Sequence, residues 1–156
     1  MNDELQIYAT GAGILEYAGE LISIIETELK RALEAAPRTH GTICGVLNKS
    51  FHILKSQHFQ WDIIPSVSVH SVGSMVPGEQ LLSLWQQYTV NMHMLLATFD
   101  NTGQAYLYLI GQFLDSNGAL NPKGVHLCEF PGYSTIGTGG DNANFWLNGS
   151  SGILVA

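Results

Sequence analysis

The fold class of this chain is decided by one stretch of its sequence: Met92-His93-Met94-Leu95-Leu96-Ala97-Thr98-Phe99, then Asp100-Asn101-Thr102-Gly103, then Gln104-Ala105-Tyr106-Leu107-Tyr108-Leu109-Ile110. Two apolar runs flank four turn-forming residues, and Asn and Gly tolerate the backbone angles that a tight turn requires. The pattern therefore predicts a β-hairpin. Because both arms are almost continuously hydrophobic, we expect both faces of the hairpin to be covered.

A long amphipathic helix is predicted before the hairpin. Apolar residues recur every three or four positions from residue 14 to residue 33, which is the period of one helix face. A short apolar stretch, residues 5–10, precedes this helix, and Gly11-Ala12-Gly13 connects the two as a close strand-to-helix turn. A second helix is expected to begin after Thr39, a suitable N-cap, and to run to His58.

The remaining pattern completes an α+β order of elements. Gly41 and Gly45 weaken the second helix, whereas residues 79–88 predict a short third one. Alternation over residues 66–72 indicates a strand or hairpin arm, and residues 125–130 indicate another strand. Helices followed by strands favour a sheet layered against helices.

Length and charge limit the function classes. The chain has 156 residues, enough for one domain with a substantial core, and we expect residues 1–156 to form a single domain. Six Lys and Arg stand against 13 Asp and Glu, which gives a net charge of −7. Nucleic-acid binding is therefore excluded, because it needs cations to neutralise phosphates. Charged residues make up only 12% of the chain, so we expect surface to be buried in a homo-oligomer.

Location and redox state follow from similar arguments. No apolar run approaches the roughly 20 residues that span a bilayer, and the first residues are acidic. We therefore expect a cytoplasmic protein without a membrane partner. Cys44 and Cys128 are expected to be free thiols in that compartment. No cofactor and no metal ion are expected.

Three stretches, taken in order, resemble the proteasome-type branch of the N-terminal-nucleophile hydrolases. They are the strand and small-residue turn at 7–14 that open the helix at 18–33, the hairpin arms at 95–100 and 105–110, and the glycine-rich turn at 134–140. The resemblance implies a four-layer αββα sandwich, in which helices enclose two sheets, and assembly into rings. It also implies kinship with self-compartmentalising threonine peptidases.

The resemblance covers the middle portion of that fold, which is apparently truncated here at both ends. In the family, the catalytic Thr is the first residue, and a Lys and an Asp tune its amine; here the first residue is Met1. A Thr hydroxyl needs such a base to become a nucleophile. We therefore expect a catalytically incomplete domain with no assigned catalytic residue, which would act on peptides only if a preceding segment existed. Residues 59–78 are longer than the family usually has there.

The glycine-rich turn supplies the candidate site residues Gly137, Thr138 and Gly139. Thr138 stands where the family often has a Ser that helps to hold the reactive N-terminus. Alternatively, the glycines just let the chain turn into a helix capped by Asp141 or Asn142, and without a partner Thr we favour this interpretation.

Self-cleavage offers another route to a reactive threonine. Cleavage at Gly41-Thr42 or Gly137-Thr138 would expose an N-terminal Thr. The first pair lies on a helical pattern and the second at the candidate support turn, so we do not expect this processing.

Four other patterns are weighed against structural interpretations. A zinc site would suit the spacings of two pairs, His40 with Cys44 and His126 with Cys128. Buried free thiols and packed histidines are commoner in proteins than such sites, so we favour a structural role for these residues. Cys44 with His52 or His58 as nucleophile and base is weaker still. Gly11-Ala12-Gly13 before a helix suits phosphate, but Glu16 would repel it. Core or interface anchors are favoured over a ligand pocket for four aromatic residues, Trp61, Trp85, Tyr88 and Trp146.

Two functions therefore remain open. The leading one is a proteasome-like domain that is catalytically incomplete in this chain, with a structural part in an assembly. The alternative is a small, non-enzymatic α+β module that binds or assembles through its apolar hairpin and tryptophans.

Overall fold

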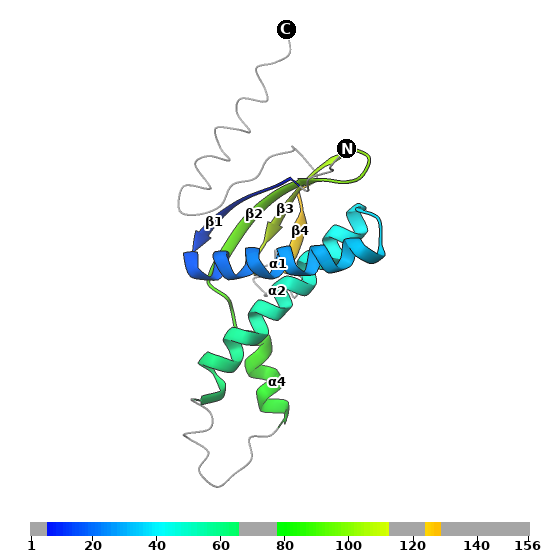
Figure 1. Ribbon diagram of the computed structural model, residues 1–156. Helices are drawn as coiled ribbons and strands as arrows, with labels where there is room; N and C mark the ends of the chain where they lie inside the picture. The colour runs from blue at the N-terminus through cyan, green and yellow to red at the C-terminus, as the bar shows by residue number, and fades with distance from the viewer. Residues whose placement is uncertain (1–5, 66–77, 113–123, 129–156) are drawn as a thin grey trace.

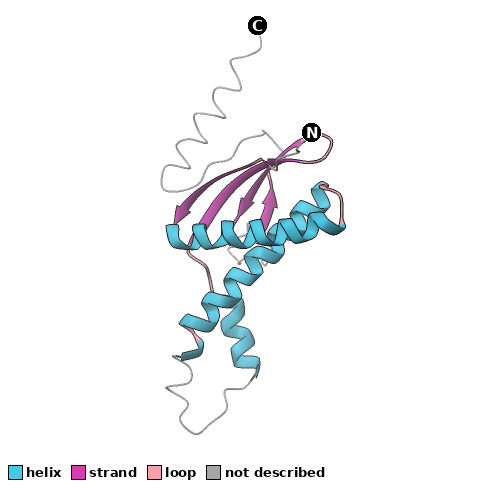
Figure 2. Ribbon diagram, in the orientation of Figure 1, coloured by secondary structure: helices cyan, strands magenta, loops and turns pink. Residues whose placement is uncertain are grey.

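The computed structural model describes residues 6–65, 78–112 and 124–128. Helices and strands form an α+β arrangement, as the sequence predicts (Figure 2). In chain order the elements are β1 (Ile7–Gly13), α1 (Leu15–Ala35), α2 (His40–Asp62), α4 (Gly78–Gln87), β2 (Met92–Phe99), β3 (Ala105–Ile110) and β4 (Val125–Leu127).

The predicted hairpin is confirmed as β2 and β3, which pair antiparallel with Leu95 opposite Leu109. Its turn is held by the buried carboxylate of Asp100, whose Oδ1 accepts hydrogen bonds from the Thr102 backbone N–H at 2.8 Å and the Gln104 N–H at 3.0 Å. Gly103 has a φ of +83°, a conformation that glycine adopts without strain. The turn chemistry read from the sequence is therefore the chemistry that closes the hairpin.

The sheet has the strand order β1-β2-β3-β4, and all three pairings are antiparallel. Helix α1 contacts β1 and β2, whereas α2 contacts β3 and β4. Figure 1 shows both helices on the same side of the sheet. The two helices therefore share one face, and each covers one half of it.

The core lies between this helix layer and the sheet. On β2, alternate residues are buried, as the two-residue period of a strand requires. The inward-facing residues Met92, Met94 and Leu96 join a cluster with Leu21 of α1 and Leu47 of α2. The other face of the sheet is also apolar, and it carries the half-buried residues Leu95, Ala97, Leu107 and Leu109.

The junction from β1 to α1 differs from the expected turn. Residues Gly11 to Gly13 belong to β1 and pair with β2 along their whole length, so the strand reaches almost to the helix. The strand and helix approach closely there, since a Cβ on Gly11 would lie 3.3 Å from the Ala18 Cβ on α1. The Ile14 N–H then donates to the Asn91 carbonyl at 3.0 Å. Asn91 immediately precedes β2, so this hydrogen bond connects the start of α1 to the start of β2.

Helix α2 forms despite its two glycines. Thr39 is the N-cap, as predicted, and its side chain accepts a hydrogen bond from the Thr42 N–H at 3.2 Å. The buried residues Ile43, Leu47 and Leu54 fasten the helix to the core. Tertiary packing therefore outweighs the low helix propensity of Gly41 and Gly45, and the helix continues past His58 to Asp62.

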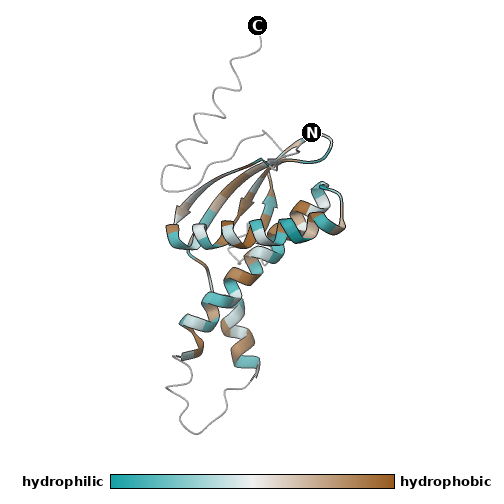
Figure 3. Cartoon of the chain, viewed as in Figure 1, coloured by the Kyte–Doolittle hydropathy of each residue, from teal (hydrophilic) through white to brown (hydrophobic). Residues whose placement is uncertain are grey.

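Helix α4 lies beside the C-terminal part of α2, away from the sheet (Figure 1). The Trp85 ring meets Phe59 edge-on at 5.3 Å, and the Lys55 ammonium lies 4.7 Å from the Trp85 ring centroid. Figure 3 shows hydrophobic and hydrophilic residues interleaved along these helices.

Residues 59–62, which the sequence places in a long connection, belong to the last turn of α2. The strand expected at 66–72 lies outside the described residues.

No helix in the described part of the chain combines the length and hydrophobicity needed to cross a bilayer. Strand β4 confirms the first three residues of the strand predicted over residues 125–130. Cys128 lies past its end, and the residues beyond Cys128 lie outside the described part.

Substitution of Gly13 tests the junction. Gly13 has a φ of +99°, and a Cβ there would lie 2.5 Å from the Asn91 carbonyl oxygen. We expect Gly13→Ala to lower the free energy of unfolding by about 2 kcal/mol, measured by urea denaturation. The control is Gly45→Ala, because a Cβ on Gly45 meets no atom within 4 Å. It should raise stability by up to about 1 kcal/mol. Equal effects of the two substitutions would contradict this description of the junction.

Candidate functional site

The candidate support turn at Gly137, Thr138 and Gly139 lies outside the described residues, so its role stays a prediction. The other candidate threonine, Thr42, lies in the first turn of α2. Its hydroxyl donates to the Pro37 carbonyl at 2.9 Å and lies 3.0 Å from the Thr39 hydroxyl. Thr42 is therefore part of the helix cap.

Two of the four residues of the possible zinc site, His40 and Cys44, have other partners. His40 Nδ1 lies 2.9 Å from the Tyr108 hydroxyl, and the Asn48 amide donates to Cys44 Sγ at 3.4 Å. Both cysteines are free thiols. Within residues 6–65, 78–112 and 124–128, no three His, Cys, Asp or Glu side chains are grouped so that they could hold a metal ion.

His40 belongs to a polar chain that joins α2 to the sheet. Its ring stacks on Tyr106 with centroids 4.9 Å apart, and the Tyr106 hydroxyl donates to Asp100 Oδ2 at 3.2 Å. Tyr108 is fully buried, and burial raises the pKa of its hydroxyl, as the neighbouring Cys44 does to a smaller extent. The hydroxyl therefore stays protonated, which suits a structural hydrogen bond between helix and strand.

A second polar group joins α1 to the end of α2. The His58 ring is buried, and its Nε2 lies 2.6 Å from Glu20 Oε2. Tyr17 packs against this ring at 4.1 Å and Trp61 meets it edge-on at 5.1 Å. His58 thus has a carboxylate and two aromatic rings as neighbours, which favours a packed histidine over a base for Cys44.

The Tyr88 hydroxyl extends this group towards α4. It donates to Asp62 Oδ2 at 2.6 Å. Burial raises the pKa of Tyr88, and the hydrogen bond to the Asp62 carboxylate raises it further. The other histidine paired with Cys44 in the catalytic hypothesis, His52, lies edge-on to Trp85 at 5.3 Å.

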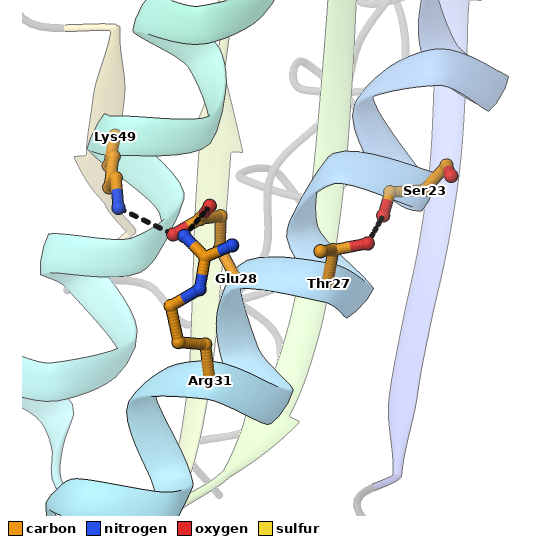
Figure 4. Close-up of polar contacts among 5 residues, drawn as sticks. All are labelled: Ser23, Thr27, Glu28, Arg31 and Lys49. Atoms are coloured by element: carbon orange, nitrogen blue, oxygen red, sulfur yellow. Dashed lines mark hydrogen bonds and ion pairs between the residues drawn. The ribbon is translucent and has the colours of Figure 1, made fainter.

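A third polar group fastens α1 to α2 in the middle of both helices (Figure 4). Glu28 is only 8% exposed, and its two oxygens accept from Lys49 Nζ at 2.6 Å and Arg31 Nη1 at 2.8 Å. The hydrogen bond from Lys49 lowers the pKa of Glu28, with a smaller contribution from the Arg31 charge, while burial opposes both. A groove of about 290 Å³ lies beside this group, and Arg31 and Lys49 line it. Both cations already pair with Glu28, so neither is left unpaired for an anionic ligand.

The two tryptophans in the described part of the chain, Trp61 and Trp85, belong to different groups of residues. Trp85 borders a groove of about 340 Å³ between α2 and α4, which His52, Ser56, Phe59, Gln60 and Ile64 also line. Trp61 belongs instead to the His58 group and is 60% exposed. Trp146 lies outside the described residues. Trp85 and Tyr88 both pack on Phe59, as the anchor interpretation predicts.

The exposed apolar side chains concentrate elsewhere. Among the described residues, eight large hydrophobic side chains are exposed, and four of them lie within 15 residues of one another. We call this group the β1–α1 surface; it consists of Tyr8, Ile14, Leu15 and Ile22. Tyr8 is 61% and Leu15 is 74% exposed. Tyr8 pairs with Ala97 and so lies on the sheet face away from the helices, whereas Leu15 and Ile22 lie on α1, so the group borders the β1 edge from both faces of the sheet. We take these residues as the candidate functional site.

Comparisons with known proteins give no relative. No family model, no curated protein and no solved structure matches the chain. The residues of this chain therefore carry the functional argument by themselves.

The Glu28 group gives a prediction about pH. A carboxyl with a lowered pKa contributes stability that is present above its unfolded pKa and is lost as pH falls through its folded pKa. Glu28→Gln should therefore destabilise the protein at pH 7, and the difference from wild type should shrink as pH falls below the ordinary value of 4.5. Urea denaturation from pH 7 to pH 3 measures this difference.

The matched control is Glu26→Gln, an exposed glutamate on the same helix. It should leave stability nearly unchanged across the series. A Glu28→Gln difference that stays constant, or grows, as pH falls would show that the ion pairs do not act as described.

Proposed function

We propose that this chain is a non-catalytic assembly module, a proteasome-like domain whose role is to associate with copies of itself. The β1–α1 surface is the observation that carries the proposal. Water contact with apolar surface costs about 25 cal/mol per Å², so burial of Tyr8 and Leu15 in an interface would favour association. The strand part of this surface, residues 7–13, carries no formal charge, which favours approach there of two copies of a chain with a net charge of −7.

The resemblance to the proteasome-type family supports the same proposal. It rests in part on the strand that leads into α1 and on the hairpin of β2 and β3, and it implies a second sheet in a four-layer sandwich. We propose that this second sheet lies on the apolar face that carries Leu95, Leu107 and Leu109. These side chains are half-buried, and helices α1 and α2 cover the opposite face.

Substitution on this face tests the sandwich. A lysine in place of Leu95 would place a charge inside a covered face, and we expect Leu95→Lys to lower the free energy of unfolding by about 2 kcal/mol. Leu82→Lys is the control, since Leu82 is 56% exposed on α4 and should tolerate the charge. Urea denaturation compares the two; equal tolerance would argue that the Leu95 face has no second layer.

The described polar residues support a structural role over peptidase chemistry. A hydroxyl nucleophile needs a base within hydrogen-bond reach. His40 holds the Tyr108 hydroxyl and His58 holds Glu20, while the Thr42 hydroxyl serves the cap of α2. Each of these groups is used to join two elements of the fold.

The mass of the protein as a function of concentration tests the proposed function. One chain has a mass of 17.0 kDa. Light scattering coupled to size-exclusion chromatography, and native mass spectrometry, should find a defined multiple of this mass at micromolar concentration. A 17.0 kDa species at every concentration up to the millimolar range would contradict self-association.

The same preparation separates the assembly module from a threonine peptidase. Fluorogenic peptides should not be hydrolysed, and the intact mass should remain that of the whole chain. Turnover together with loss of a segment that ends before a threonine, such as Thr42 or Thr138, would instead restore the enzymatic interpretation.

A further inference from the structure

We infer that the contact between copies is made by strand β1: two chains pair their β1 edges antiparallel, about a twofold axis at Thr10, and continue one sheet into the other. This inference rests on the proposed self-association and names the surface that performs it. Its partner is a second copy of the chain. The arguments below concern the edge, its side chains, the adjacent helix and the charge.

Strand β1 is an edge strand without the usual protection. It pairs with β2 from Ile7 to Gly13 with no bulge, and the described residues place no strand on its other side. Most of its residues are exposed. Edge strands of natural proteins usually carry Lys, Pro or a bulge that prevents pairing with another chain. The sequence Ile-Tyr-Ala-Thr-Gly-Ala-Gly of β1 has no charge and no proline.

The residues of β1 are complementary to their own reversed order. Thr10 is the midpoint of Ile7–Gly13, so antiparallel pairing about Thr10 places Tyr8 opposite Ala12 and Ala9 opposite Gly11 of the second copy. The large side chains in the first half of the strand then face small ones in the second half. A twofold interface requires this kind of self-complementarity, because the same patch must serve on both sides.

Helix α1 is placed to reinforce the junction. Glu20 and Glu28 contact α2, through His58 and Lys49, so they define the flank of α1 that faces α2. Ile22 lies about 200° around the helix from Glu20, at 100° per residue. Leu15 is seven residues before Ile22 and therefore shares its flank. Since α1 covers β1 and β2 while α2 covers β3 and β4, this flank faces beyond the β1 edge.

The spacing of the joined sheet suits contact between the two α1 helices. A twofold axis perpendicular to the sheet keeps both helices on one face. Each α1 covers a β1–β2 pair, and the centres of the two pairs would lie two strand spacings apart, about 10 Å. Helices pack at about 8–10 Å, so the two α1 flanks could contact each other; because the axis makes the helices antiparallel, at most one of Leu15 and Ile22 would meet its own equivalent. Gly19, between them, has space for a close approach, since a Cβ there meets no atom within 4 Å.

Charge also favours a second copy over a basic or acidic partner. Residues 6–15 carry no Lys, Arg, Asp or Glu, although the chain as a whole has a net charge of −7. A charged partner would find nothing to pair with along this edge, whereas a second copy brings an equally uncharged strand. The exposed Glu26 lies four residues after Ile22 and shares its flank of α1, so it is the like charge that the two copies would bring nearest to each other.

A charge-swap experiment at Thr10 tests the inference on the full chain. Because Thr10 would face Thr10 of the second copy, Thr10→Lys alone, or Thr10→Glu alone, places like charges directly opposite each other. Each variant should weaken dimerisation at least tenfold, measured by sedimentation equilibrium. An equimolar mixture of the two should recover the dimer, because opposite charges then meet. Recovery on mixing excludes misfolding as the cause of the loss.

The matched control is the pair Thr27→Lys and Thr27→Glu, at an exposed threonine on α1 whose hydroxyl donates to the Ser23 carbonyl (Figure 4). These variants should dimerise like wild type. An oligomeric wild type that is unaffected by Thr10→Lys would overturn the β1 contact and leave the proposed function standing. A monomeric wild type would overturn both.

Discussion

The packing of α1 and α2 against one face of the sheet is the constraint on which the rest of the structure depends. Inward residues of β2, such as Met94 and Leu96, meet Leu21 and Leu47 of the two helices. Because side chains alternate along a strand, the same register places Leu95 on the opposite face. Two helices divide four strands between them, so α1 lies over β1 and β2, and among the described residues no strand pairs with the outer edge of β1.

Much of this fold could be predicted from local sequence. The hairpin follows from an Asx and Gly turn between apolar runs, and the Asp100 carboxylate accepts the bonds that such a turn offers. The N-cap at Thr39 and the period of α1 are equally local. The glycines led to two wrong expectations. Gly41 and Gly45 weakened the prediction of α2, which forms because its apolar residues are buried in the core. Gly11 and Gly13 predicted a turn, whereas strand β1 continues through both residues.

The polar groups could not be predicted, because their members are distant in sequence. Glu20 and His58 are 38 residues apart and His40 and Tyr108 are 68 apart, and no spacing rule connects them. The sequence contained only part of the pattern that would have indicated the group around His40. His40 and Cys44 share a helix face, and Tyr106 and Tyr108 share a strand face, but nothing in the sequence places the two faces together. Sequence reasoning considered metal for the first pair and favoured packed side chains, and it could not find the partner on β3 that His40 contacts. The low content of charged residues predicts association but does not show which surface would perform it.

The central claim is that this chain acts by association through β1, and hydrogen exchange tests it most directly. Backbone N–H groups on the outer edge of β1 exchange with water in a monomer and become hydrogen-bonded when two edges pair. Mass spectrometry of the peptide that covers Ile7–Gly13 should therefore show protection that increases with protein concentration, while a peptide from the buried β2 strand stays unchanged. Identical exchange of the β1 peptide at all concentrations would contradict the account.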